Sequence, residues 1–102
     1  MNQIAIEDEN KKRKLTTICI PRVDLNTSKQ YIFHVFKKLN IGFVENISEY
    51  PIKNNSTHKR IMIKIKWNKT ELAKYICDRF DIGENIKIVH SNPWYWSICE
   101  AR

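Results

Sequence analysis

Residues 60–67 place an isoleucine or tryptophan at every second position, with Met62 and basic side chains between them, and this stretch constrains the fold more than any other part of the chain. Alternation with a period of two is typical of a strand that lays one face against an apolar core. The stretch therefore predicts a half-buried strand. Its inward side chains are Ile61, Ile63, Ile65 and Trp67, and its outward ones are Met62, Lys64 and Lys66. Two ammonium groups on the outer face indicate either a solvated surface or a cationic platform for a polyanion.

The chain has 102 residues, enough for one domain with one core, and a formal net charge of +7. Residues 1–15 hold four basic and three acidic side chains, so most of the excess positive charge belongs to the rest of the chain. A basic domain of this size favours a polyanionic partner, of which nucleic acid is the most common.

Residues 1–14 lack hydrophobic periodicity and predict a flexible basic arm ahead of a domain at 15–102. The run Lys11-Lys12-Arg13-Lys14 is a candidate nuclear-import signal or phosphate-binding arm, or simply a solvated group of charges. No apolar run approaches the ~20 residues needed to cross a bilayer, and the N-terminus is unlike a signal peptide. We therefore expect an intracellular protein, cytoplasmic or nuclear, with no membrane partner.

Turn and cap residues divide the remaining sequence into short elements. Val44 and Ile47 have opposite parity within one of them, which predicts a bulge there. The expected elements are a strand at 15–23, a helix from the caps at 26–28 to Leu39, an edge strand at 43–52 interrupted by Pro51, a basic loop at 53–59, the strand at 60–67, a helix from the cap Asn68 to 81–83, and extended pieces at 85–90 and 94–101.

The order β-α-β-β-α-β predicts an α+β fold of the ferredoxin-like kind. We expect a four-stranded antiparallel sheet with two helices on one face and an extra short strand before the last strand. Antiparallel sheets tolerate one uncovered face, so the face opposite the helices should be open.

The aromatic run Trp94-Tyr95-Trp96 must divide its rings between the two faces of the last strand. The expected parity buries Trp94 and Trp96 in the core and leaves Tyr95 on the open face near Cys19. Tyr95 is then the best candidate for stacking on a base, although a slip of one residue would reverse the assignment.

Residues 15–102 resemble the RNA recognition motif (RRM) family in their layout. Residues 18–23, Ile-Cys-Ile-Pro-Arg-Val, align with the family's first-strand motif, and residues 60–67 align with its third-strand motif. The resemblance implies an open sheet that binds RNA or single-stranded DNA. Both motifs are degenerate, because Cys19, Met62 and Lys64 stand where the family has aromatic side chains that stack on bases.

The C-terminal stretch at 92–102, Asn-Pro-Trp-Tyr-Trp-Ser-Ile-Cys-Glu-Ala-Arg, resembles the tail of small uncharacterised proteins of large DNA viruses. The chain is also rich in Lys, Ile and Asn, as an AT-rich viral genome would encode. The resemblance implies a viral protein that acts in the host cell or the virion.

Two functions remain open at this point. The first is a weakly sequence-specific binder of RNA or single-stranded DNA that relies on phosphate contacts and a stacking surface. The second is a protein-interaction or virion-structural module that uses the open face and the C-terminal aromatic cluster, with Tyr50, Tyr95 and any exposed tryptophan as anchors. Either would be a monomer or a weak dimer. For the first function the phosphate-neutralising residues would be Arg22, Lys59, Arg60, Lys64 and Lys66, with Tyr95 and Met62 for stacking.

Catalytic and metal-binding patterns are missing from the sequence. The two glycines are isolated, the acids are scattered, and no histidine lies close in sequence to a cysteine. Three widely spaced cysteines without a CxxC pair argue against a disulfide framework or a zinc site. We expect neither an enzyme nor a cofactor.

Overall fold

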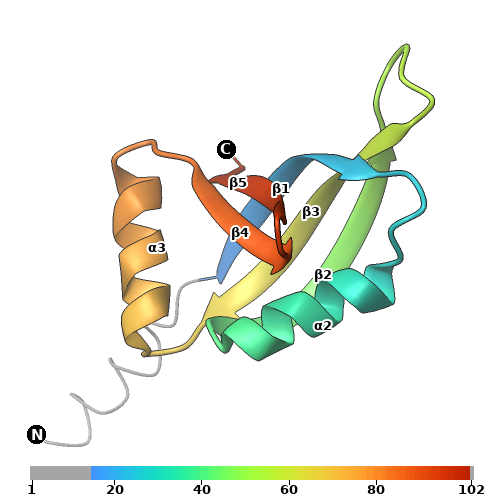
Figure 1. Cartoon of the computed structure of the whole chain (residues 1–102). Helices are drawn as coiled ribbons and strands as arrows, with labels where there is room; N and C mark the ends of the chain where they lie inside the picture. The colour runs from blue at the N-terminus through green and yellow to red at the C-terminus, as the bar shows by residue number, and fades with distance from the viewer. Residues whose placement is uncertain (1–14, 102) are drawn as a thin grey trace, which may run out of the picture.

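Five strands and two helices make up residues 15–101, the part of the chain that the computed structural model describes. The predicted arm at 1–14, with its basic run at 11–14, lies outside these residues. The elements are β1 (Leu15–Asp24), α2 (Lys29–Leu39), β2 (Gly42–Pro51), β3 (His58–Trp67), α3 (Glu71–Asp81), β4 (Ile86–Ser91) and β5 (Trp94–Glu100), as Figure 1 shows.

The strands form an antiparallel sheet in the order β2-β3-β1-β5-β4. The predicted α+β class is confirmed, whereas the count of four strands is wrong. Residues 86–91 form a fifth strand, because the turn at Asn92 and Pro93 folds them back along β5 with Ile88 opposite Trp96. The short extended piece expected before the last strand is thus a full member of the sheet and forms its edge.

The inner face of the sheet and the apolar stripes of both helices form one core. Ile61, Ile63 and Ile65 of β3 are fully buried, and each such side chain stabilises the fold by roughly 1.5–3 kcal/mol. The rings of Trp67 and Phe80 of α3 meet edge to face with centroids 6.2 Å apart. Both helices therefore pack against the inner face, as predicted.

Side chains cap both helices, but the second cap differs from the prediction. Ser28 Oγ accepts from the Tyr31 backbone N–H and begins α2 as expected. Thr70, and not Asn68, caps α3 by accepting from the Ala73 N–H. The Asn68 amide instead donates to the Asn40 carbonyl and side-chain oxygens, so it ties the start of α3 to the end of α2.

The bulge predicted in the edge strand is present. The register between β2 and β3 shifts between Val44 and Asn46. Beyond the shift Asn46, Ser48 and Tyr50 lie opposite outward residues of β3, so the bulge turns their side chains away from the helices.

The expectation that Trp94 is buried is wrong. Its side chain is 68% exposed, whereas Trp96 is 5% exposed. Trp94 is opposite Ser91 at the end of the β4–β5 hairpin, past the register shift that follows Val89. Side-chain parity therefore predicts the burial of Trp96 correctly, whereas Trp94, beyond the register shift at the end of the hairpin, is exposed.

Candidate functional site

The face of the sheet opposite the helices is called the open face here. Strand alternation supplies its side chains, because every second residue of each strand points away from the core. No helix of residues 15–101 covers it, and neither helix is long and apolar enough to cross a membrane. Its residues include Thr17 and Cys19 of β1, Asn46, Ser48 and Tyr50 of β2, Arg60, Met62, Lys64 and Lys66 of β3, Lys87 and Val89 of β4, and Tyr95, Ser97 and Cys99 of β5.

Side chains on the open face line up in rows across the strands, since paired residues lie directly opposite one another. In one row, a thioether side chain lies between a hydroxyl group and two thiols. In the next row, an ammonium group lies between a side-chain amide and a hydroxyl group. Tyr50 lies opposite Arg60 beside them. The first row is Ser48, Met62, Cys19 and Cys99, and the second is Asn46, Lys64 and Thr17.

A hollow of about 350 Å³ lies over these rows. Its apolar component is Met62 with the ring of Tyr50, and its polar groups include the Lys64 ammonium. The Ala101 N–H donates to the Thr17 carbonyl at 2.8 Å, so the end of the described chain forms one wall. The lining residues are Thr17, Asn46, Ser48, Tyr50, Met62, Lys64 and Ala101.

Three cations, Arg60, Lys64 and Lys66, lie on the outer side of β3. Lys64 and Lys66 are two residues apart, about 7 Å along the strand, whereas Met62 separates Arg60 from Lys64, which are about 13 Å apart. Arg60 and Lys64 are exposed, and no carboxylate within residues 15–101 lies close enough to pair with either. Lys66 is partly neutralised, because its Nζ lies 3.2 Å from Glu45 Oε2. The positive charge is therefore concentrated on Arg60 and Lys64.

Lys59, expected among the phosphate-neutralising residues, points to the opposite side of β3. Its residue is 7% exposed, and its Nζ lies 2.7 Å from both Glu49 Oε2 and the Thr27 carbonyl oxygen. The parity of Lys59 matches that of the core isoleucines, and Glu49 supplies the charge that its burial requires. Lys59 is a structural residue and is not available to a ligand.

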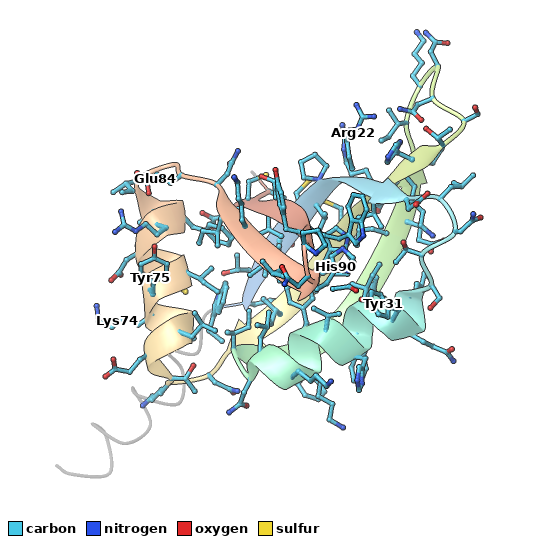
Figure 2. The ribbon with its side chains drawn as sticks, in the orientation of Figure 1. Arg22, Tyr31, Lys74, Tyr75, Glu84 and His90 are labelled. Atoms are coloured by element: carbon cyan, nitrogen blue, oxygen red, sulfur yellow. The ribbon has the colours of Figure 1, made fainter. Side chains whose placement is uncertain are left out.

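Arg22 lies apart from the other cations, near the base of the β2–β3 loop (Figure 2). It falls in the irregular part of β1, where the register with β3 shifts between Ile20 and Val23. The Arg22 Nη2 lies 3.4 Å from His58 Nδ1, which also contacts the Thr57 hydroxyl at 2.8 Å. Arg22 thus extends the positive surface toward the loop instead of joining the row on β3.

Two tyrosines flank the cations. Tyr95 lies on the open face as predicted, with 49% of its surface exposed, and the Lys87 ammonium lies 4.8 Å from its ring centroid. Tyr95 is not beside Cys19 as expected, because Cys99, four residues further along β5, lies opposite Cys19. Tyr50, on the opposite edge of the sheet, is also 49% exposed. The sequence analysis assigned Tyr50 only to a protein interface and missed Lys87. The bulge signalled by Val44 and Ile47 would have placed Tyr50 beside Arg60 had the parity been counted across it.

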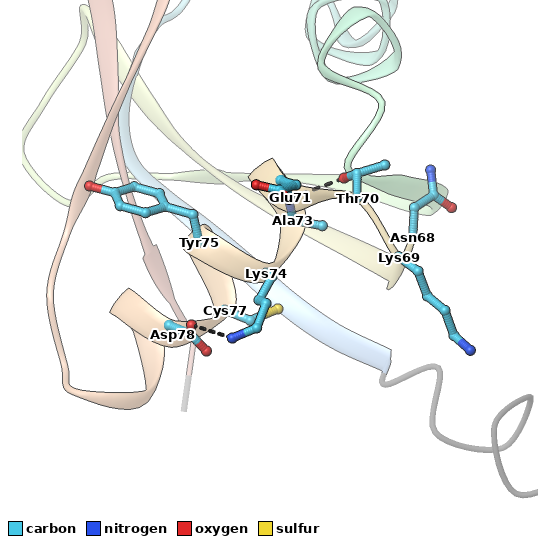
Figure 3. A pocket seen from close by; sticks show the side chains of 9 residues that line it. All are labelled: Asn68, Lys69, Thr70, Glu71, Ala73, Lys74, Tyr75, Cys77 and Asp78. Atoms are coloured by element: carbon cyan, nitrogen blue, oxygen red, sulfur yellow. Dashed lines mark hydrogen bonds and ion pairs between the residues drawn. The ribbon is translucent and has the colours of Figure 1, made fainter.

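A larger hollow, of about 770 Å³, lies away from the open face, along α3 and the turn that precedes it (Figure 3). Lys74 and Asp78 point toward one another across one side of it, with Nζ 2.9 Å from Oδ2. Its main apolar surface comes from the ring of Tyr75 and the side of Cys77. Its size exceeds that of the hollow on the open face, but its ammonium–carboxylate pair leaves little net charge for a polyanion.

Residues 15–101 hold no cluster of three His, Cys, Asp or Glu side chains that could bind a metal. Cys19, Cys77 and Cys99 form no disulfide with one another. The open face presents two tyrosine rings, a methionine, hydroxyls, an amide and cations, of which Arg60 and Lys64 pair with no carboxylate of residues 15–101.

Comparison of the chain with protein-family models, with curated proteins and with solved structures found no match in any of the three.

Proposed function

We propose that the chain is an RRM-like domain that binds single-stranded nucleic acid, RNA or DNA, across the open face. The observation that carries the proposal is the pair Arg60 and Lys64, two exposed cations on either side of the Met62 thioether that pair with no carboxylate of residues 15–101. Phosphates would be neutralised by these cations, and bases would stack on Tyr50 and Tyr95.

The strand order supports this assignment. The sheet contains the run β2-β3-β1-β5, so the two strands that carry the motif-like segments, β1 and β3, are adjacent. β4 is an addition at the edge. The departures in the first- and third-strand motifs remain, since Cys19, Met62 and Lys64 occupy the positions of the usual aromatic rings. Binding should accordingly depend on phosphate contacts more than on base identity.

Exposed aromatic rings on both sides of the cations favour single strands. Every base has a π face, so stacking on Tyr50 and Tyr95 tolerates any sequence. Bases in a duplex are stacked on one another and unavailable to such rings. Single-stranded RNA or DNA should therefore bind more tightly than a duplex of the same length.

The test is a fluorescence-anisotropy titration of the full chain with labelled single-stranded RNA, single-stranded DNA and duplex DNA at several salt concentrations. With about three phosphates neutralised by Arg60, Lys64 and Lys66, the plot of log affinity against log salt for a single strand should have a slope of about −2. Lys64→Glu should weaken binding about tenfold or more, since 1.4 kcal/mol changes affinity tenfold.

Lys38→Glu is the matched control, because it makes the same charge change on an exposed residue of α2. It should change the affinity less than twofold if the open face is the site. If Lys64→Glu and Lys38→Glu lost the same affinity, the oligonucleotide would be attracted by net charge alone, and the open face would be rejected as the site. Absence of binding to all three oligonucleotides at low salt would reject the function.

An apolar end of the β4–β5 hairpin favours a second candidate, a protein-interaction or virion-structural module. Trp94 is 68% exposed and Val89 is 59% exposed, and both lie near the turn of that hairpin. Exposed tryptophans are frequent anchors of protein interfaces. This candidate becomes the preferred one if oligonucleotides fail to bind, and Trp94→Ala would then be the first variant to test against a partner.

A further inference from the structure

Two of the three cysteines lie side by side on the open face, although 80 residues separate them in sequence. Cys19 of β1 and Cys99 of β5 are directly opposite one another in the antiparallel register. The Cys99 thiol lies 3.8 Å from the Cys19 carbonyl oxygen, so its side chain lies over β1. Residues paired in this way have Cα atoms about 4.5–5.5 Å apart, within the range of about 4.4–6.8 Å that disulfides span.

The two thiols differ in their access to solvent. Cys19 is 8% exposed, and its burial raises the pKa of its thiol, as does the neighbouring Cys99 thiol, while Arg60 acts in the opposite sense. Cys99 is only partly buried. A solvent oxidant therefore reaches Cys99 first, and Cys19 is held in place to react with it.

Cys77 has no part in this arrangement. It lies on α3 and packs against the core on the inner side of the sheet. The sheet separates it from the open face, so it can join neither Cys19 nor Cys99 without unfolding. This makes Cys77 an internal control for any oxidation of the chain.

We propose that Cys19 and Cys99 form a peroxide-sensitive dithiol that closes to a disulfide across β1 and β5. The Cys99 thiolate attacks one oxygen of hydrogen peroxide, which breaks the O–O bond and leaves Cys99 sulfenic acid and hydroxide; the proton lost when the Cys99 thiol ionised converts this hydroxide into the first water. The Cys19 sulfur then attacks the Cys99 sulfur, and the departing hydroxide takes the Cys19 proton as a second water. Two thiols and one peroxide thus become one disulfide and two waters, and a dithiol reductant reverses the change.

The disulfide would link β5, the last strand, covalently to β1. β5 is attached to β1 through only two register pairs and the Ala101 N–H bond to Thr17. A cross-link over so long a separation removes many conformations from the unfolded chain. The oxidised protein should therefore melt about 10 °C higher than the reduced protein. This inference does not depend on nucleic-acid binding.

The experiment treats the full reduced chain at low concentration with hydrogen peroxide, blocks the remaining thiols and maps tryptic peptides by mass spectrometry. The three cysteines fall in separate peptides, at 15–22, 75–79 and 88–102. We expect 15–22 to be linked to 88–102 with the loss of two hydrogen atoms, while 75–79 carries the blocking group. Reductant should release the link.

Cys77→Ser should leave the link and the rise in Tm unchanged, whereas Cys99→Ser should abolish both. The mapping of the unmutated chain needs no variant, so the result stands even if a substitution disturbs folding. A link to 75–79, disulfides only between chains, or sulfinic acid at Cys99 without any link would overturn the proposal.

Discussion

Lys59 and Lys64 lie on the same strand but on opposite faces of the sheet, and the difference decides what each side chain does. Lys59 Nζ is held at 2.7 Å by Glu49 and by the Thr27 carbonyl, with 9% of its side chain exposed. Lys64 is exposed to solvent on the open face. One lysine therefore serves stability and the other is free to serve binding.

Lys59→Met should lower the free energy of unfolding by about 2 kcal/mol, because it removes two charge-assisted hydrogen bonds and leaves Glu49 without its cation. The fall in the free energy of unfolding stays moderate, since Glu49 is 37% exposed and can be hydrated. Lys64→Met should change stability by less than about 0.5 kcal/mol. Urea unfolding of both variants measures this, and equal costs would contradict the two assignments.

At the scale of elements, the passage from α2 into β2 depends on a close approach of two backbones. Gly42 begins β2 opposite Trp67, and a Cβ at this position would lie 2.3 Å from the Lys66 carbonyl oxygen and 2.8 Å from Ile65 Cγ1. Backbone and a buried core side chain cannot move aside easily. Glycine is therefore required here for space.

Gly42→Ala should lower the free energy of unfolding by about 3 kcal/mol, since the added methyl group overpacks the β2–β3 pair. Gly83→Ala is the control: its φ of 79° disfavours alanine, but nothing lies within 4 Å, so about 1 kcal/mol is expected. Thermal unfolding followed by circular dichroism compares them. If Gly42→Ala lowered the free energy of unfolding no more than Gly83→Ala does, β2 would be able to shift away from β3.

For the whole molecule, one aromatic cluster joins three elements that are far apart in sequence. The Tyr31 hydroxyl of α2 lies 2.9 Å from His90 Nδ1 of β4, and the His90 ring stacks on Trp96 of β5 at 4.2 Å between centroids (Figure 2). Burial in this cluster lowers the pKa of His90 below its usual 6.5. Protonation of His90 should therefore weaken the contacts that join α2, β4 and β5.

The unfolded chain binds the His90 proton more readily than the folded one, so stability is full above about pH 6.5 and falls as the pH drops through the lower folded pKa. Urea unfolding at a series of pH values should show this decline. His90→Gln should remove part of it, and His34→Gln, which changes an exposed histidine of α2, should leave it in place. A wild-type decline that His90→Gln does not alter would assign it to other groups.

Much of the fold was predictable because its signals are local. The alternation at 60–67 predicted which side of β3 is buried, and Ile61, Ile63 and Ile65 are all fully buried. The stripe of α2 and its cap at Ser28 follow from spacing along a helix in the same way. The error at Asn68 has a long-range cause, since its side chain is taken by Asn40 of the preceding helix end.

The candidate site was predictable only in part. Alternation alone placed Lys64, Met62 and Tyr95 on the open face, where the structure has them. The fate of Lys59 depended on Glu49, a residue of another strand, and the exposure of Trp94 depended on the register shift between β4 and β5. Neither can be predicted from alternation along a single strand.

The sequence by itself determined the α+β class, the inner and outer faces of β3 and the positive charge, because these follow from side-chain chemistry repeated at short intervals. Only the tertiary structure decided that β4 joins the sheet, that Lys59 forms a buried ion pair and that Cys19 lies opposite Cys99. Each of these depends on strand register between segments distant in the chain. Register is set by the packing of all the elements together, so it cannot be predicted from a single segment.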